Sequence, residues 1–172
     1  MTHPNPSVPP PLFLHATAAI NGAAVLVLQI VGGRLLAPYL GSSHYVWTAQ
    51  ILTTLIALAI GYLLGGWLTD RRTPLAWLFW MTLTAAGYLM GIISFVERIA
   101  FASLQWSLPV GALASAMALF FVPLLLLAIT APFLLKALPI HAANVGSQVG
   151  ILSAISTAGS VAGALVAGLW FS

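Results

Sequence analysis

The sequence contains no cysteine and very little charge. The absence of cysteine excludes disulfide bonds, thiolate metal sites and cysteine nucleophiles. Among 172 residues there are only 5 Lys+Arg and 2 Asp+Glu, so charged residues make up 4% of the chain, against about 25% in soluble domains. A soluble fold of this size could not cover its surface with so few charges. The net charge of +3 comes without a basic patch that could follow phosphates, which excludes nucleic acid as a partner.

Apolar residues are abundant instead, at 61% of the chain, and they form five segments long enough to cross a bilayer. A crossing takes about 20 residues, and each must be helical because lipid cannot satisfy free backbone groups. The sequence therefore predicts an all-α fold, a polytopic transmembrane helix bundle of five spans. The predicted spans are Leu12–Leu35, Tyr45–Leu68, Leu75–Val96, Val110–Leu134 and Val145–Phe171.

Prolines mark the parts outside or within these helices that should be irregular. Residues 1–11 contain five prolines and are predicted to form a disordered tail, which leaves residues 12–172 as the transmembrane helical domain. Turn-forming and interfacial residues predict loops at Pro38–Ser43 and Ile99–Pro109. Pro123 is expected to kink the fourth span.

The few cations predict an orientation. With the N-terminus in the cytoplasm, Arg71, Arg72 and Lys136 lie inside, while Arg34 and Arg98 lie outside. This arrangement agrees with the excess of positive charge in cytoplasmic loops. We therefore predict an integral protein of the bacterial inner membrane, with the N-terminus cytoplasmic and the C-terminus outside.

No residues occur in the patterns that catalysis requires. The sequence has no nucleotide-binding glycine pattern and no P-loop. Its two acids, Asp70 and Glu97, are expected on opposite sides of the membrane, where they cannot act together as acid and base. No two histidines have metal-ligand spacing, and a cofactor shared by His15 and His141 near the inner surface is the alternative. No catalytic, cofactor-binding or metal-binding residues are therefore predicted, and the chain is not expected to be an enzyme.

Small residues recur at four-residue spacing, which lets helix backbones approach closely in lipid. Gly61 and Gly65 do so in the second span, and Gly159 and Gly163 in the last. We interpret these glycines as internal helix-packing positions, with contact to a second subunit as the alternative. Further rows with the same spacing are Gly87 with Gly91, and Gly146 with Gly150 and Ala154.

Polar residues within the spans predict either helix-to-helix bonding or the lining of a cavity. A hydroxyl stripe at helical spacing runs along the last span, where it can bond its own backbone. Three amides lie within the first two spans. The residues of this predicted polar set are Asn21, Gln29, Gln50, Ser153, Ser156, Thr157 and Ser160.

Charges at the ends of the spans have two interpretations. Arg34, near the end of the first span, is a snorkelling anchor or a contact for an anionic group such as a lipid headgroup. Gly66-x-x-x-Asp70-Arg71-Arg72 marks where the second span meets water, and its spacing looks like a loop of major-facilitator transporters. In that loop the acid steadies helix packing, so Asp70 is expected to contact a helix end or a cation.

Four stretches of the sequence are GRLLAPYLGSS (33–43, followed by YVWT), GYLLGGWLTDR (61–71), PFLLK (132–136) and GILSAISTAGS (150–160). Together they resemble the sequences of spermidine-synthase-like integral membrane proteins. The resemblance implies a membrane part similar to half of a major-facilitator transporter, joined in that family to a soluble, Rossmann-type aminopropyltransferase domain. This sequence has no nucleotide-binding glycines and no acidic polyamine pocket, so aminopropyl transfer is not expected of it.

Three hypotheses for function follow. The first is a non-enzymatic integral membrane module that packs with other membrane subunits, with lipids or with a second copy of itself. The second is a small transporter, or half of one, for a polyamine-like or other small solute. The third is a membrane anchor for a separate aminopropyltransferase-like chain.

Overall fold

The computed structural model describes residues 10–71, 74, 76–138 and 145–170. Most of the predicted tail lies outside these ranges, as do Arg72 and His141. Pro11, which the sequence assigned to the tail, is instead the first residue of helix α1. A proline suits this position because its missing N–H would have no partner within the helix.

Within the described ranges, five helices are long and apolar enough to cross a membrane. They confirm the predicted all-α transmembrane bundle, and the chain is an integral membrane protein. The third and fourth spans each contain a short irregular turn, η1 or η2, between two α-helical parts. The elements are α1 Pro11–Leu40, α2 His44–Asp70, α3 Ala76–Ile92, η1 Ile93–Phe95, α4 Val96–Ser103, α5 Leu108–Ala116, η2 Met117–Phe121, α6 Val122–Ala137 and α7 Val145–Trp170.

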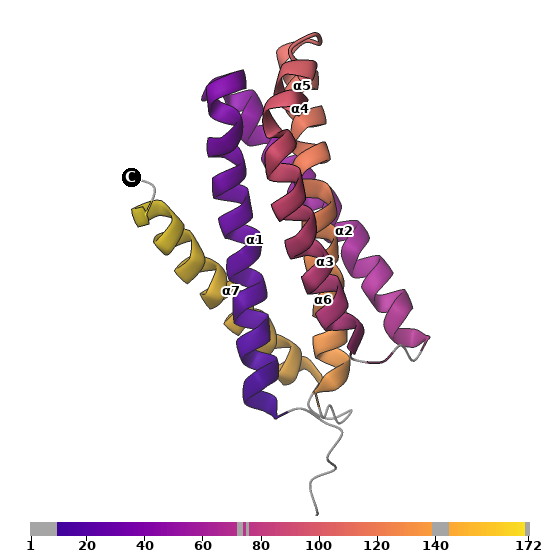
Figure 1. Cartoon of the computed structure of the whole chain (residues 1–172). Helices are drawn as coiled ribbons and strands as arrows, with labels where there is room; N and C mark the ends of the chain where they lie inside the picture. Colours follow the sequence, from indigo (N-terminus) through magenta and orange to yellow (C-terminus); the bar gives the residue numbers. More distant parts are fainter. Residues whose placement is uncertain (1–9, 72–73, 75, 139–144, 171–172) are drawn as a thin grey trace, which may run out of the picture.

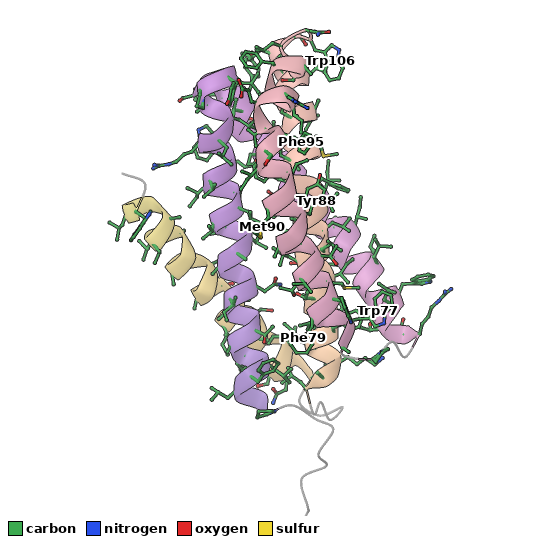
Figure 2. All side chains as sticks on the ribbon, viewed as in Figure 1. Trp77, Phe79, Tyr88, Met90, Phe95 and Trp106 are labelled. Carbon is green, nitrogen blue, oxygen red and sulfur yellow. The ribbon has the colours of Figure 1, made fainter. Side chains whose placement is uncertain are left out.

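Successive spans run in opposite directions (Figure 1). α1, α3 and α7 begin at the end of the bundle that holds Asp70, and α2 and α6 end there. We call this the Asp70 end, and the opposite one the Gly41 end. Exposed tryptophans lie at both ends, with Trp106 at the Gly41 end and Trp77 towards the Asp70 end (Figure 2). Such aromatic residues favour the headgroup region on each side of a bilayer.

The predicted loop at Pro38–Ser43 is shorter than expected. α1 continues through Pro38 to Leu40 and ends where Gly41 adopts a positive φ of 76°. Leu36 and Leu40 are buried on the same face of the last turns. Their burial holds the helix together beyond the proline, which removes only one backbone donor.

The predicted loop at Ile99–Pro109 is also partly helical. α4 extends the third span to Ser103 because Val96, Ala100 and Ser103 form one buried face at helical spacing. Glu97 lies on the exposed side. The irregular connection is therefore limited to the four residues between Ser103 and Leu108.

The fourth span lies at the centre of the bundle. In its most apolar window 56% of the residues are buried, against 11–28% in the other spans. α2 and α3 both pack on α6. Buried apolar side chains form two clusters, one around Leu124 and Phe120 and the other, nearer the Asp70 end, around Phe133 and Leu134.

A π-turn interrupts the fourth span directly before Pro123. The sequence predicted a kink at this proline, and the structure shows the wider turn η2 just before it. Proline cannot donate to the carbonyl four residues earlier, so the ordinary α-helical pattern cannot continue there. The Tyr88 hydroxyl donates a 2.6 Å hydrogen bond to the Ala118 carbonyl within this turn.

α7 is peripheral. It packs chiefly on α1, and in Figure 1 it crosses α1 and then diverges from the other helices towards the C-terminus. Only 11% of its most apolar window is buried. Most of its surface therefore faces lipid or a partner chain.

Candidate functional site

The crossing of α1 and α7 depends on glycines of both helices. A Cβ added at Gly159 would collide with the Ala19 carbonyl, and one at Gly22 with the Ser156 carbonyl. At Gly163 an added Cβ would lie 2.9 Å from the Cα of Ala23. Glycine therefore permits a backbone distance that any other residue would increase.

α2 and α6 are held together in the same way. A Cβ at Gly61 would lie 2.8 Å from the Leu125 carbonyl oxygen, and one at Gly65 would lie 2.7 Å from the Ile129 carbonyl oxygen. Gly61, Gly65, Gly159 and Gly163 thus all lie at contacts within the chain. In contrast, no described residue lies within 4 Å of a Cβ added at Gly66.

These two close contacts leave a cavity of about 430 Å³ between the pairs. α7 is tied to α1, and α2 is tied to α6, so the space where α7 faces α2 and α6 is not filled. The cavity brings together four of the seven residues of the predicted polar set. Its lining is Ala18 and Asn21 of α1, Tyr62 of α2, Ala131, Pro132, Leu134 and Leu135 of α6, and Leu152, Ser153, Ser156 and Thr157 of α7.

Asn21 is the polar residue that links α1 to α6. Its Nδ2 donates to the Leu127 carbonyl at 3.0 Å and to the Thr130 hydroxyl at 2.7 Å. The Thr130 hydroxyl in turn donates to the Leu127 carbonyl at 2.6 Å. Both amide protons of Asn21 are therefore used, and because Asn21 lines the cavity, its Oδ1 is the atom that can still accept a hydrogen bond.

The hydroxyls of α7 combine the two roles that the sequence predicted as alternatives. Thr157 donates to the Ser153 carbonyl at 2.9 Å, and Ser160, outside the cavity lining, donates to the Ser156 carbonyl at 3.0 Å. These bonds to the preceding turn satisfy the hydroxyl protons. The oxygen of Thr157 can still accept a bond, while the hydroxyls of Ser153 and Ser156 make no side-chain hydrogen bond to a described residue.

Gln29 and Gln50 lie outside the cavity. Gln29 is half-buried on α1. Gln50 is fully buried against Gly32, and neither its Nε2 nor its Oε1 has a hydrogen-bond partner among the described residues. A buried amide was expected to find a partner, and none is seen for Gln50 among the described residues. The buried hydroxyls of Thr53 and Ser115 also have no hydrogen-bond partner among the described residues.

The charged residues of the Asp70 end also lie apart from the cavity. Asp70 is exposed and makes no ion pair or side-chain hydrogen bond with any described residue. Arg71 lies over the Trp67 ring, with 3.6 Å between its Cζ and the ring centroid. Lys136 donates instead to the Thr69 carbonyl, which joins the end of α6 to the end of α2. The expected contact of Asp70 with a cation or a helix end is thus not seen in the described part of the chain.

Arg34 lines a separate pocket of about 350 Å³ towards the Gly41 end. Glu97 and Ser94 of the third span lie on the other side of that pocket. The sequence had placed Arg34 and Glu97 on the same side of the membrane but had not predicted that they would share a pocket. Both side chains are exposed, as interfacial charges commonly are.

No group of three or more potential metal ligands occurs among the described residues. The alternative of a cofactor shared by His15 and His141 involves a residue outside the described ranges. What the sequence missed is Tyr62: it is one of several exposed aromatics of α2, and its spacing gives no signal that distinguishes it from a lipid-facing side chain.

No protein-family model matches this chain, and no curated protein or solved structure matches it. The resemblance to spermidine-synthase-like membrane proteins therefore stays a prediction. The same holds for the role that it implies for Asp70.

Proposed function

We propose that the protein is a non-enzymatic module of the membrane that associates within the bilayer with another integral membrane subunit or with a second copy of itself. The observation that carries this proposal is the position of α7. It is joined mainly to α1, and nearly all of its remaining surface is uncovered.

The uncovered side of α7 is suited to a close helix contact. None of the described residues lies within 4 Å of a Cβ added at Gly146 or at Gly150. Gly150 and Gly159 are about two and a half turns apart, so they lie on opposite sides of the helix. Gly159 faces α1, and the row of Gly146, Gly150 and Ala154 is free for a second helix.

The test is association in mild detergent with and without the variant Gly150→Leu. We expect the wild-type chain to purify as a dimer or with a membrane partner, and Gly150→Leu to yield a folded monomer without it. Leu165→Ile, an exposed and volume-conserving change on the same helix, is the control. A wild-type chain that stays monomeric and partner-free, even after cross-linking in membranes, would contradict the proposal.

We place the module in the bacterial inner membrane with the Asp70 end in the cytoplasm. Arg71 and Lys136 support this orientation, since both lie at that end. Because the chain has no native cysteine, single cysteines at Thr73 and Ser42 can report sidedness. Labelling of Ser42→Cys but not Thr73→Cys by an impermeant reagent outside the cell is expected, and the reverse pattern would invert the orientation.

A half-transporter is the second candidate, and the cavity favours it. Transporter sites commonly lie between helices well inside the bilayer, next to broken helices. Here the cavity borders Pro132 within α6 and the hydroxyls of α7. Uptake of radiolabelled amino acids or polyamines into proteoliposomes tests this function, and flux no greater than in empty liposomes would argue against it.

A further inference from the structure

We propose that the cavity between α1, α2, α6 and α7 binds the uncharged, hydroxyl-bearing head of a lipid such as a monoacylglycerol, which enters from the membrane between α2 and α7. On α7 the cavity is lined by Ser153 and Thr157, which lie three and seven residues after Gly150 and so share a face with the proposed association row. Photolabelling tests lipid binding and detergent association tests the partner contact, so the two proposals can fail separately.

The cavity lies deep within the membrane. At about 1.5 Å per residue, Tyr62 lies about 12 Å along α2 from its end at Asp70, and Thr157 lies about 18 Å along α7 from its start at Val145. The hydrocarbon layer is about 30 Å thick, so both residues lie well inside it. A ligand reaching this level is surrounded by apolar material and not by headgroups.

The cavity is accessible from the surrounding lipid. Tyr62 is 49% exposed, and Ser153 and Thr157 are also exposed although they line the cavity. At this depth an exposed side chain faces lipid. Among the described residues, α7 packs chiefly on α1, and its contact with α2 is at most slight. The cavity therefore opens sideways into the bilayer, in the manner expected for a lipid ligand.

The lining of the cavity determines the charge of the ligand that it can accept. The described lining contains no charged side chain, and the nearest cation along the chain, Lys136, is bonded to the Thr69 carbonyl. A phosphate or a carboxylate would be buried there without a counter-charge, which is costly in a membrane. An uncharged head is the chemistry that fits.

The polar side chains of the lining offer mainly hydrogen-bond acceptors. The Asn21 amide and the Thr157 hydroxyl have already donated their protons, so both offer only acceptor oxygens to a ligand. Ser153 and Ser156 can donate or accept. Hydroxyl groups on the ligand match this acceptor-rich set, and an ester oxygen can accept from a serine.

The leucines of α6 and Leu152 supply the apolar wall against which an acyl chain can lie. The volume of about 430 Å³ lies within the range of about 300–1,000 Å³ of small-molecule sites.

The experiment is photolabelling of the purified chain in detergent with a diazirine-bearing monoacylglycerol, followed by peptide mapping. We expect labels on peptides of α2, α6 and α7 that are competed by unlabelled monoolein. Lysophosphatidic acid with the same chain should compete at least about tenfold less well, because its phosphate has no counter-charge. Equal competition by lysophosphatidic acid would show that the site does not require an uncharged head. Competition by free glycerol would show that the ligand need not be a lipid.

Variants test the position of the site. Ser153→Trp should fill the cavity and abolish labelling, while the double variant Ser153→Ala/Thr157→Val should weaken it about five- to tenfold through the loss of one or two hydrogen bonds. Ser160→Ala, on the same helix but outside the lining, is the control. Labelling that is unchanged in both cavity variants would overturn the proposal, and the near-isosteric double variant keeps the test valid if Ser153→Trp fails to fold.

Discussion

The hydroxyl of Tyr88 on α3 donates a 2.6 Å hydrogen bond to the carbonyl oxygen of Ala118, thirty residues further along the chain. Ala118 lies in the π-turn that precedes Pro123. In such a turn a carbonyl bonds to the amide five residues on, and for Ala118 that residue is Pro123, which has no N–H. Inside a membrane no water replaces this missing donor. Tyr88 thus both satisfies the turn and fixes α3 against the central span.

Removing this hydroxyl should destabilise the bundle. We expect Tyr88→Phe to lower the free energy of unfolding by about 1 kcal/mol, the net contribution of one hydrogen bond. Thermal unfolding in detergent measures the change. Tyr45→Phe is the matched control, since Tyr45 is an exposed aromatic on α2. An equal effect of the two variants would show that the bond to Ala118 contributes nothing specific.

The contact of α7 with α1 should not tolerate a large side chain. Gly163→Leu would place atoms where the Ala23 backbone lies, and we expect a loss of about 1–3 kcal/mol or detachment of α7. Leu165→Ile should leave the melting temperature nearly unchanged. Measured beside Gly150→Leu, the result separates the two faces of α7: Gly163→Leu should damage the fold, whereas Gly150→Leu should affect association alone. A normally folded Gly163→Leu monomer would contradict the crossing described above.

At the Asp70 end, Lys136 should matter more for stability than Asp70. Lys136→Met removes the bond to the Thr69 carbonyl and is expected to cost about 0.5–1 kcal/mol, a modest value because the side chain is partly in water. Asp70→Asn should change stability less, since Asp70 contacts no described cation. The resemblance to the transporter loop predicts the opposite order, so the two melting temperatures in detergent decide between them.

The number and type of the helices followed from the sequence because the bilayer restricts the choice so strongly. Five apolar runs such as Tyr45–Leu68 have no other stable form in lipid. The ends were less predictable. Pro38 and Ile99 were assigned to loops on local signals, whereas burial of Leu40 and Ala100 extends both helices. Tertiary contact decides such boundaries, and it is not visible in a single segment.

The candidate site was predictable in part for a similar reason. Asn21 and the hydroxyls of α7 stand out because polar residues are rare in apolar spans. Which of them meet depends on the crossing angle of α7, which spacing does not encode. From the sequence, Gln50 and Ser153 were equally good candidates for a polar site. In the structure Gln50 is buried with no hydrogen-bond partner among the described residues, whereas Ser153 lines the cavity.

The two amides of α1 provide a final prediction, because they share a helix face but differ in their surroundings. Asn21 bonds to the Leu127 carbonyl and to Thr130 on the central span, while Gln29, eight residues later, is half-buried outside the cavity lining. We expect Asn21→Leu to lower the free energy of unfolding by about 0.6–1.7 kcal/mol, from the average to the largest value measured for such bonds between membrane helices. Gln29→Leu should change it by less, since no bond to α6 is lost. Unfolding of both variants in mixed detergent micelles measures the difference. If Gln29→Leu proved the more damaging, α1 would be held by its Gly41 half, and the linkage through Asn21 would not be what positions α1 beside the cavity.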